Sequence, residues 1–350
     1  MAIAPTRSSP VTTRVPRLRR SDPAGPGYAR RRCGKGFMYL DEDGERITDS
    51  ETVARIAALV IPPAWTDVWI SPDPFGHIQA TGFDQAGRKQ YLYHPRWRER
   101  RDQEKFDDMV RFARSLPGLR EVVAHDLDLR DLSREHILAC ATRLLERGLF
   151  RIGSEQYAVT NETYGLATMR KCHVTVDGEV IHFDYLAKEH KRQVKAVVDP
   201  QVADVVATLK RRRGGGDELL AYKRDRTWCD VRSHDINAYL KAATSLDVSA
   251  KDFRTWGATV LAAMALGVTE PSHLTQHARK RAIVRAVKEV AFYLGNTPTV
   301  ARNSYIDPRV FDRYRDGHRI VPDLDLINGD PQGTAIQGPI EAAVLDLLEG

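Results

Sequence analysis

One stretch of the sequence combines side chains that could carry out chemistry on a phosphate group. Residues 294–306 read Leu-Gly-Asn-Thr-Pro-Thr-Val-Ala-Arg-Asn-Ser-Tyr-Ile. Gly295 is expected to end one helix, and Thr297-Pro298 to begin a short new one. An amide donor (Asn296), a cation (Arg302) and a phenol (Tyr305) lie on these segments. A tyrosine can simply pack in a core, but the nearby side chains of Asn296 and Arg302 favour an anion-binding site in which Tyr305 is a nucleophile.

A second anion site is predicted where a helix begins near residue 250. Ser249-Ala-Lys-Asp252 fits the pattern of a capping box. Lys251 and Arg254 are three residues apart, so we expect both to point the same way from the first turn. Backbone N–H groups at a helix N-terminus also attract anions, and we therefore expect a phosphate at this end of the helix.

Two further cations lie between these segments and the N-terminal part. Arg151 follows a helix that Ser133 caps, and it stands between two apolar residues, where an arginine needs an anionic partner. Lys188 lies at a hairpin tip, beyond two strands that turn at Asp177-Gly178. Lys191 lies in the same basic turn and is a competing candidate, and a solvated lysine is the ordinary outcome in such a loop.

A short segment of the N-terminal part has the composition of a DNA-reading strand. In Arg88-Lys-Gln-Tyr-Leu-Tyr93, alternation places Gln90 and Leu92 on one face and Tyr91 and Tyr93 on the other. Glutamine can pair with adenine, and tyrosine can donate a hydrogen bond to a phosphate. An amphipathic edge strand without a binding role is the alternative interpretation.

Taken together, these motifs resemble type IB DNA topoisomerases of the poxvirus-like and bacterial branch, over roughly residues 34–320. The resemblance rests on Gly-Asn-Thr-Pro…Ser-Tyr305, on Arg151-Ile-Gly153, on Lys251-Asp-Phe-Arg-Thr-Trp-Gly257 and on the segment 88–93. Poxvirus members usually carry histidine where Asn296 stands, and bacterial members often carry asparagine. The family often has glycine before its catalytic lysine, where this chain has Ala187.

The resemblance implies a fold, a reaction and roles for the residues. Tyr305 is then the nucleophile of a 3′-phosphotyrosine intermediate, and Lys188, alone or with Arg151, is the general acid. Arg151, Arg254 and Asn296 are the residues that donate hydrogen bonds to the phosphate. It further implies DNA contacts from Lys89, Gln90, Tyr91, Tyr93 and Lys251. The expected activity is relaxation of supercoiled double-stranded DNA by a monomer that closes as a clamp, with no metal, ATP or other cofactor.

Three other interpretations compete with this one. Tyrosine site-specific recombinases share the catalytic fold, but they carry histidine at the position of Lys251 and lack the segment 88–93. A non-catalytic DNA-binding protein is disfavoured because the nucleophile and the cations are all present. A metal site at His273, His277 and His318 is not expected, because their spacing is irregular and carboxylates do not accompany them.

Composition limits the number of domains, the class of partner and the cellular compartment. The chain has 350 residues, of which 42% are hydrophobic and 29% charged, enough for two domains with their own cores. The net charge is +6, but eight arginines fall within residues 1–32, so charge alone is a weak pointer to DNA. No apolar run could span a membrane, and the four scattered cysteines suit a reduced compartment, so we expect a cytoplasmic protein. The resemblance further implies that it works on the bacterial nucleoid.

The predicted fold class is α+β with two domains. Residues 1–32 are expected to form a disordered basic tail that grips DNA, and their prolines argue against a mitochondrial transit peptide. Residues 33–96 are expected to form a β-rich DNA-binding domain, and residues 97–320 a mainly helical catalytic domain with a β-hairpin. A helix from about Arg96 should end at Leu116-Pro-Gly118. Residues 321–350 form an acidic segment that ends in a docking helix over 340–348.

Overall fold

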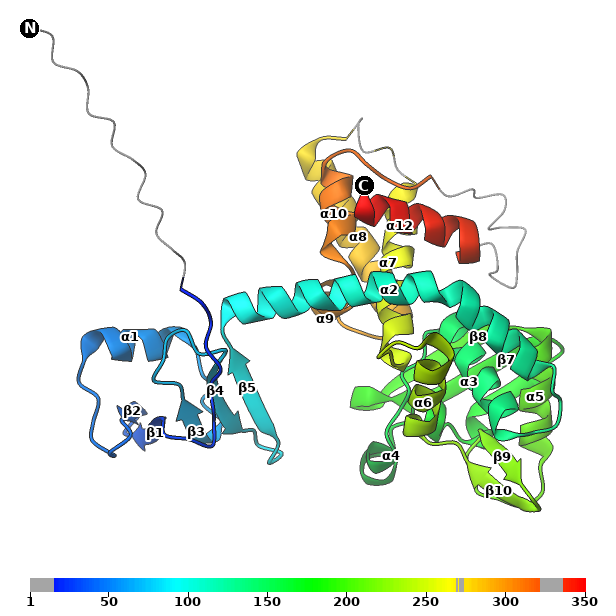
Figure 1. The fold of residues 1–350 in the computed structure, drawn as a ribbon, viewed down its shortest axis with the longest axis horizontal. Coiled ribbons are helices and arrows are strands. Elements are labelled where there is room, and N and C mark those ends of the chain that lie inside the picture. The colour runs from blue at the N-terminus through cyan, green and yellow to red at the C-terminus, as the bar shows by residue number, and fades with distance from the viewer. Residues whose placement is uncertain (1–15, 269, 271–273, 322–335) are drawn as a thin grey trace, which may run out of the picture. The chain divides into compact units, whose positions relative to one another are not determined.

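A computed structural model describes residues 16–268, 270, 274–321 and 336–350 (Figure 1). The chain divides into two compact units, Met1–Lys105 and Phe106–Gly350, here called the N-terminal and C-terminal units. The division falls inside helix α2 (Pro95–Leu127), whereas the sequence predicted a domain boundary near residue 96, where this helix begins.

The N-terminal unit is built on a five-stranded antiparallel sheet in the order β2-β1-β3-β4-β5. Its strands are β1 (Tyr28–Cys33), β2 (Gly36–Leu40), β3 (Thr66–Ile70), β4 (Ile78–Phe83) and β5 (Lys89–Tyr93). Helix α1 (Ser50–Ala58) begins at Asp49, whose carboxylate accepts a hydrogen bond from the backbone of Thr52. Buried Ile56 of α1 packs with the apolar face of the sheet and so closes a small core.

The prediction that residues 1–32 are disordered is wrong for the part that the structure describes; residues 1–15 lie outside it. The backbone N–H of Ser21 donates to His77 Nδ1 over 2.9 Å, and Trp69 Nε1 donates to the carbonyl of Gly25 over 3.2 Å. From Tyr28 the chain continues as β1, which pairs with β2 and β3. Composition could not show this order, because partners distant in the sequence supply the hydrogen bonds.

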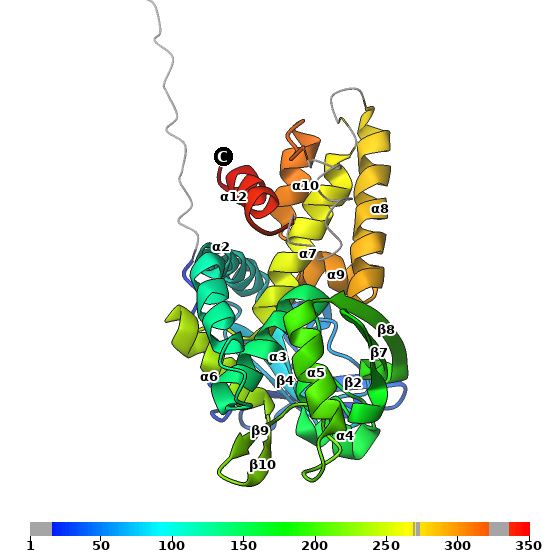
Figure 2. The ribbon, with the colours of Figure 1, turned by 90° about the vertical axis from the view of Figure 1, so that its right-hand side faces the viewer.

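The C-terminal unit combines helices with two small sheets (Figure 2). Its helices are α3 (Arg134–Gly148), α4 (Glu155–Asn161), α5 (Pro200–Arg211), α6 (Ser233–Thr244), α7 (Ala250–Gly267), α8 (Gln276–Leu294), α9 (Pro298–Ser304), α10 (Pro308–Arg315) and α12 (Glu341–Glu349). One sheet contains β6 (Val174–Asp177), β7 (Val180–Ala187) and β8 (Lys191–Val198), and the other β9 (Ala221–Arg224) and β10 (Thr227–Asp230). The predicted α+β class, with a β-rich first unit and a mainly helical second one, is confirmed.

Helix α2 overturns one prediction. It does not end at Leu116-Pro-Gly118 but continues through Pro117 to Leu127. Proline lacks the N–H that an internal helical position needs, which costs one hydrogen bond. Leu119, Val123 and Leu127 are buried beyond it. Burial of these side chains explains why the helix persists.

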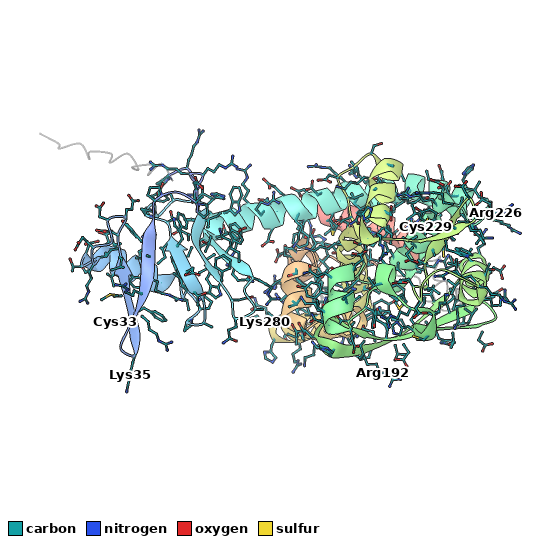
Figure 3. All side chains as sticks on the ribbon, turned by 90° about the horizontal axis from the view of Figure 1, so that it is seen from below. Cys33, Lys35, Arg192, Arg226, Cys229 and Lys280 are labelled. Carbon is teal, nitrogen blue, oxygen red and sulfur yellow. The ribbon has the colours of Figure 1, made fainter. Side chains whose placement is uncertain are left out.

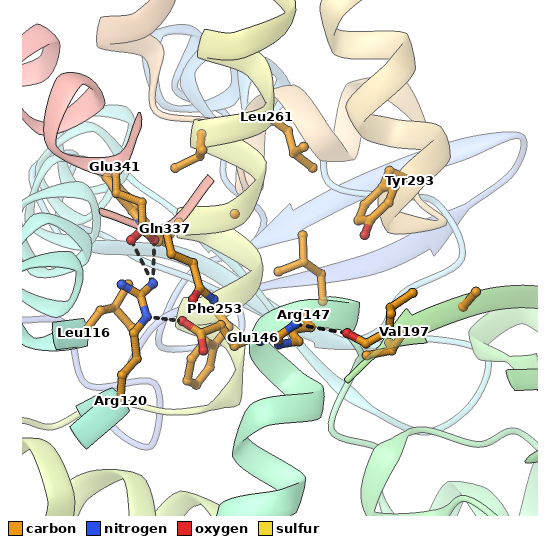
Figure 4. A pocket seen from close by; sticks show the side chains of 16 residues that line it. Leu116, Arg120, Glu146, Arg147, Val197, Phe253, Leu261, Tyr293, Gln337 and Glu341 are labelled. Carbon is orange, nitrogen blue, oxygen red and sulfur yellow. Dashed lines mark hydrogen bonds and ion pairs between the residues drawn. The ribbon is translucent and has the colours of Figure 1, made fainter. Parts of the chain in front are cut away.

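The predicted C-terminal docking helix is confirmed as α12, with Val344 and Leu348 in the core of the C-terminal unit. Its first residue, Glu341, accepts hydrogen bonds from Arg120 and from Trp256 Nε1, the latter over 2.7 Å. Arg120 also binds Glu146 over 2.7 Å, and Figure 4 shows it between the two carboxylates. The end of the chain is therefore tied to α2 and α7 by a largely buried charge network.

The surface is charged on both units, and Figure 3 shows Lys35, Arg192, Arg226 and Lys280 directed outward. The four cysteines are all free thiols. Among the helices that the structure describes, none is sufficiently long and apolar to cross a membrane.

Candidate active site

The ends of two helices meet at the centre of the candidate site. Helix α3 stops at Gly148, followed by Leu149 in the left-handed conformation (φ 46°), and α8 stops at Leu294, followed by Gly295 (φ 63°). The last carbonyl groups of a helix lack partners within the helix and carry its partial negative charge. Both helix ends therefore attract cationic side chains, as the next residues show.

Arg254 on α7 bridges these two helix ends. Its Nη1 donates to the carbonyl of Leu149, and its Nη2 donates to that of Leu294 over 2.9 Å. The side chain is only 3% exposed. Burial lowers the pKa of Arg254, and the charge of Arg151 lowers it further, while Tyr305 acts in the opposite direction. Of its three nitrogens, Nε is shielded from solvent and has no hydrogen-bond partner in the observed geometry, although the Tyr305 side chain lies near enough to the guanidinium to favour its charged form.

Arg151 connects the same region to Asn296. Its Nη2 donates to the carbonyl of Gly295 over 2.8 Å and to Asn296 Oδ1 over 2.5 Å. Both acceptors are neutral, so these contacts do not balance the charge of Arg151. Because the amide oxygen of Asn296 is engaged, its Nδ2 is the group left over, and this buried donor has no partner.

Tyr305 follows directly after α9, a short helix that begins at Thr297 and Pro298 as the sequence predicted. Its phenol ring is half-buried, and the Cζ of Arg254 lies 5.2 Å from the ring centroid. Thr259 on α7 contacts the backbone there: its Oγ1 accepts from the N–H of Asp307 over 3.1 Å and lies 3.4 Å from the carbonyl oxygen of Tyr305, while its proton is donated to the carbonyl of Thr255 over 2.9 Å. One helix thus positions both Arg254 and the candidate nucleophile.

The tip between β7 and β8 carries both candidate lysines. Lys191 Nζ forms an ion pair with Glu189 Oε2 over 2.8 Å. Among the described residues, none forms a hydrogen bond or ion pair with Lys188. Glu189 and His190 both adopt positive φ angles (65° and 53°), which makes the turn tight. Ala187 has φ −95°, an ordinary value, so the backbone at this position does not require the glycine often found in the family.

Four of the five predicted catalytic residues line one cleft of about 240 Å³. These are Arg151, Lys188, Asn296 and Tyr305, and Lys191 lines it as well. Arg254 is the fifth, and it is buried beside the ring of Tyr305. The structure therefore assembles residues that are more than 150 positions apart in the sequence around the phenol of Tyr305.

Lys251 is not among them. It is exposed at the start of α7, whereas Arg254 is buried, so the two side chains do not point the same way as expected. The capping box is present, and the carboxylate of Asp252 accepts from the N–H of Ser249 over 2.8 Å. This carboxylate brings negative charge to the helix start, which disfavours a phosphate bound by the backbone N–H groups there and leaves the exposed amine of Lys251 as the available donor.

The N-terminal unit holds the other predicted group. On β5 the side chains of Lys89, Tyr91 and Tyr93 are exposed, while Gln90 and Leu92 are partly buried, so the predicted alternation is confirmed. The rings of Tyr91 and Tyr93 are stacked with centroids 6.0 Å apart. Gln90 Nε2 donates to Asp84 Oδ2 over 3.0 Å, so its amide is engaged within the unit.

A second cavity of the C-terminal unit, of about 250 Å³, has a largely apolar lining that includes Leu116, Phe253 and Leu261 (Figure 4). Its two arginines, Arg120 and Arg147, are already paired with Glu146 and Asp199, so the lining offers little that could hold a phosphodiester. Of the three histidines considered as metal ligands, His273 lies outside the described residues. Within the part of the chain that is described, no group of three or more potential ligands is assembled.

Sequence reasoning missed two residues of the site, Thr259 and Lys195. Thr259 was detectable as a polar side chain in the apolar stripe of α7. Lys195 shares the inward face of β8 with Val197, and its Nζ donates to the carbonyls of Gly148 over 2.8 Å and of Tyr293 over 3.1 Å. An inward lysine between apolar strand positions is a weak signal, but it was available.

Comparison with known families decides between the type IB topoisomerases and the related recombinases. The family described as "Eukaryotic DNA topoisomerase I, catalytic core" matches residues 94–319, and "Bacterial DNA topoisomerase IB, N-terminal domain" matches residues 36–84. The chain belongs to the type IB DNA topoisomerases. The resemblance inferred from the motifs is thereby confirmed, and this topoisomerase is an enzyme that acts on DNA.

Individual relatives agree with this assignment. DNA topoisomerase 1B of Acanthamoeba polyphaga mimivirus is 29% identical over 313 residues, which cover 87% of this chain and 92% of the relative. DNA topoisomerase 1B of Vaccinia virus (strain Copenhagen) is 20% identical over 235 residues, or 67% and 72% of the two chains. DNA topoisomerase 1 of Daucus carota is 26% identical over 160 residues, which are 45% of this chain and 19% of the plant protein.

Proposed function

We propose that this topoisomerase relaxes supercoiled DNA by cutting one strand transiently through a 3′-phosphotyrosine at Tyr305. The phenol oxygen attacks phosphorus and loses its proton, while the bond from phosphorus to the 5′ oxygen breaks and that oxygen gains a proton. The covalent bond to tyrosine conserves the energy of the phosphodiester, so resealing is the reverse step and needs no ATP. Supercoils are lost by rotation of the duplex while the strand is open.

The observation that carries this proposal is a pair of buried donors without partners near Tyr305. Arg254 Nε and Asn296 Nδ2 are both shielded from water. A buried donor without an acceptor costs free energy, so a group that accepts from it is bound with corresponding strength. In the transition state, the pentacoordinate phosphorus carries growing negative charge on its two non-bridging oxygens. Fixed hydrogen-bond donors beside these oxygens lower the barrier.

Proton transfer to the leaving oxygen is assigned to Lys188. Its amine lies on the cleft without an ion-pair partner among the described residues, whereas Lys191 is engaged by Glu189. A positioned general acid contributes about 10²–10⁴-fold to such a step. The protein's own cations neutralise the phosphate, and we therefore expect the reaction to proceed without a divalent metal ion.

The proposal extends to DNA recognition and to where the enzyme works. We assign Lys89, Tyr91 and Tyr93 on β5, with Gln90 once released from Asp84, to contacts with duplex DNA, and Lys251 to a phosphate flanking the cut. We further propose that the enzyme acts as a monomer on the bacterial nucleoid. Residues 1–15 add basic charge that would strengthen binding to any sequence.

Plasmid relaxation with EDTA present and ATP absent tests the proposal. We expect both negative and positive supercoils to be removed, and rapid denaturation during turnover to leave protein on the 3′ end of a nicked strand, opposite a 5′ hydroxyl. A strict need for Mg²⁺ or ATP, or a protein linked to the 5′ end, would exclude the mechanism.

A further inference from the structure

Three cations connect the ends of α3 and α8, each to a neighbouring pair of acceptors. Lys195 bridges the carbonyls of Gly148 and Tyr293, and Arg254 bridges those of Leu149 and Leu294. Arg151, which follows α3 in the chain, binds the carbonyl of Gly295 and the amide oxygen of Asn296. We call this arrangement the carbonyl ladder. Its cations donate hydrogen bonds to carbonyl groups at both helix ends that have no partner within their own helix. Two of the three cations, Arg151 and Arg254, are also proposed phosphate ligands.

Lys195 is the cation of the carbonyl ladder that lies away from the cleft. Its ammonium lies 4.6 Å from the ring centroid of Tyr293 and 5.7 Å from that of Phe150, so aromatic faces surround it. Phe150 is fully buried. Lys195 is absent from the cleft lining, so it does not touch the reacting phosphate. Its contacts are with the backbone that holds Arg254 and Asn296 in place.

We propose that Lys195 is a positioning residue for cleavage, which fixes the ends of α3 and α8 and so holds Arg254 and Asn296 in register with Tyr305. This inference rests on the proposed function and adds a residue to it. The two carbonyls that bind Lys195 directly precede the two that bind Arg254, so a shift of either helix end moves the Arg254 guanidinium. A displacement of about 1 Å at a catalytic group is enough to lower a rate by roughly 10²-fold.

The charge of Lys195 gives this role a recognisable pH dependence. Burial, with the nearby charges of Arg254 and Arg151, lowers the pKa of Lys195 to about 7. The charged and titratable groups around it are Arg254 on α7, Arg151 after α3 and Tyr293 on α8, while its cross-strand neighbour on β7 is Phe183, which does not titrate.

An anionic phosphodiester favours the protonated amine and so raises the pKa of Lys195 in the complex. Protonated Lys195 therefore binds DNA and the transition state more strongly than neutral Lys195. This gain in binding is complete below the pKa that Lys195 has in the free enzyme. It disappears as pH rises through the higher pKa that Lys195 has in the DNA complex.

The test compares Lys195→Met, Lys195→Arg and wild type in single-turnover cleavage of a duplex between pH 6 and 9, alongside non-covalent DNA affinity. We expect Lys195→Met to cleave about 10–100-fold more slowly at pH 7, with a smaller change in affinity. Lys195→Arg keeps the charge and the donors, so it should recover most of the rate and lack the decline that the titration of Lys195 adds above pH 7. The matched control is Lys210→Met, since Lys210 Nζ also donates to a backbone carbonyl, that of Val174.

The outcomes separate the two proposals. If wild-type enzyme forms no covalent adduct, the proposed function fails. If wild type forms it and both Lys195 variants match its rate and pH profile, only the positioning role is excluded. A rate loss in Lys195→Met no larger than in Lys210→Met, measured on folded protein, overturns it too. Should Lys195→Met not fold, the pH profile of Lys195→Arg decides, because a profile identical to that of wild type contradicts the role of the charge.

Discussion

The two surfaces assigned to DNA differ in how their side chains are held. Around Tyr305, cations are locked by backbone carbonyls, and Arg254 is 3% exposed. On β5 of the N-terminal unit, Tyr91 and Tyr93 are 41% and 37% exposed, and their rings stack on each other. Both groups contain donors suited to phosphate, but only the first is fixed before DNA arrives.

This difference matches the role that we propose for each surface. Charge that develops in a transition state is stabilised best by donors that need not reorganise, which explains the buried ladder of helix ends. Recognition needs contacts that adapt to the groove, and exposed aromatic residues on a strand provide them with little loss of stability. Substitutions should therefore separate cleanly into effects on rate and effects on affinity.

The largest effect is expected from the nucleophile. Tyr305→Phe removes one oxygen and keeps the ring next to Arg254, so folding and non-covalent DNA binding should survive while covalent trapping and relaxation vanish. Gel assays of trapped adducts measure this directly. The control is Tyr314→Phe, because Tyr314 is 1% exposed and its hydroxyl has no partner, so its loss should leave activity intact. An adduct on Tyr305→Phe would place the nucleophile at another residue.

Substitution of Arg254 should have the next largest effect. Loss of a preorganised transition-state donor costs about 10²–10³-fold in rate, so Arg254→Ala should cleave slowly at nearly unchanged DNA affinity. Asn296→Ala should cost less, since a neutral amide donates a weaker hydrogen bond than a guanidinium. Arg254→Ala also leaves the carbonyls of Leu149 and Leu294 without a partner, so its unfolding free energy must be measured as well. A variant that lost DNA binding but kept its cleavage rate would contradict the assignment.

The sequence predicted the parts of the site that follow local rules. Gly295 as a helix stop, Thr297-Pro298 as a helix start and the capping box at Ser249 are short-range signals, and the structure contains all three. The predicted direction of Lys251 failed because helix spacing does not tell which face of a helix is buried. The ladder was out of reach, because it depends on two helix ends, 145 residues apart at Arg151 and Asn296, that only tertiary packing brings together.

The same limit explains the two incorrect segment predictions. Pro117 is a strong local stop signal, but burial of Leu119 and Val123 outweighs it. Residues 16–32 have the composition of a disordered tail, but pairing with strands from later in the chain orders them. In both cases contacts distant in the sequence overrode a correct local preference.

A third comparison lies within the cleft, between the two lysines of the β7–β8 tip. Lys188→Met should slow cleavage about 10²-fold, the lower range for loss of a general acid, whereas Lys191→Met should have a much smaller effect because Glu189 already engages that amine. A substrate with sulfur in place of the leaving 5′ oxygen provides the decisive measurement. Since a thiolate leaves without protonation, it should restore the rate of Lys188→Met. If the sulfur substrate instead restored the rate of Lys191→Met and not that of Lys188→Met, Lys191 would be the general acid.

The smallest effect is expected on β5, where Tyr93→Phe removes a hydroxyl and keeps the stack with Tyr91. A single hydrogen bond to phosphate is worth about 1 kcal/mol, so the dissociation constant for duplex DNA should rise roughly fivefold while the rate of cleavage on saturating DNA stays constant.

Lys89→Ala, on the same strand, should in addition lower the slope of log affinity against log salt by about one unit. Tyr39→Phe, on β2 and packed against the core of the same unit, is the matched control and should change neither quantity. If Tyr93→Phe slowed cleavage on saturating DNA, the separation between fixed catalytic donors and adaptable recognition contacts would not hold.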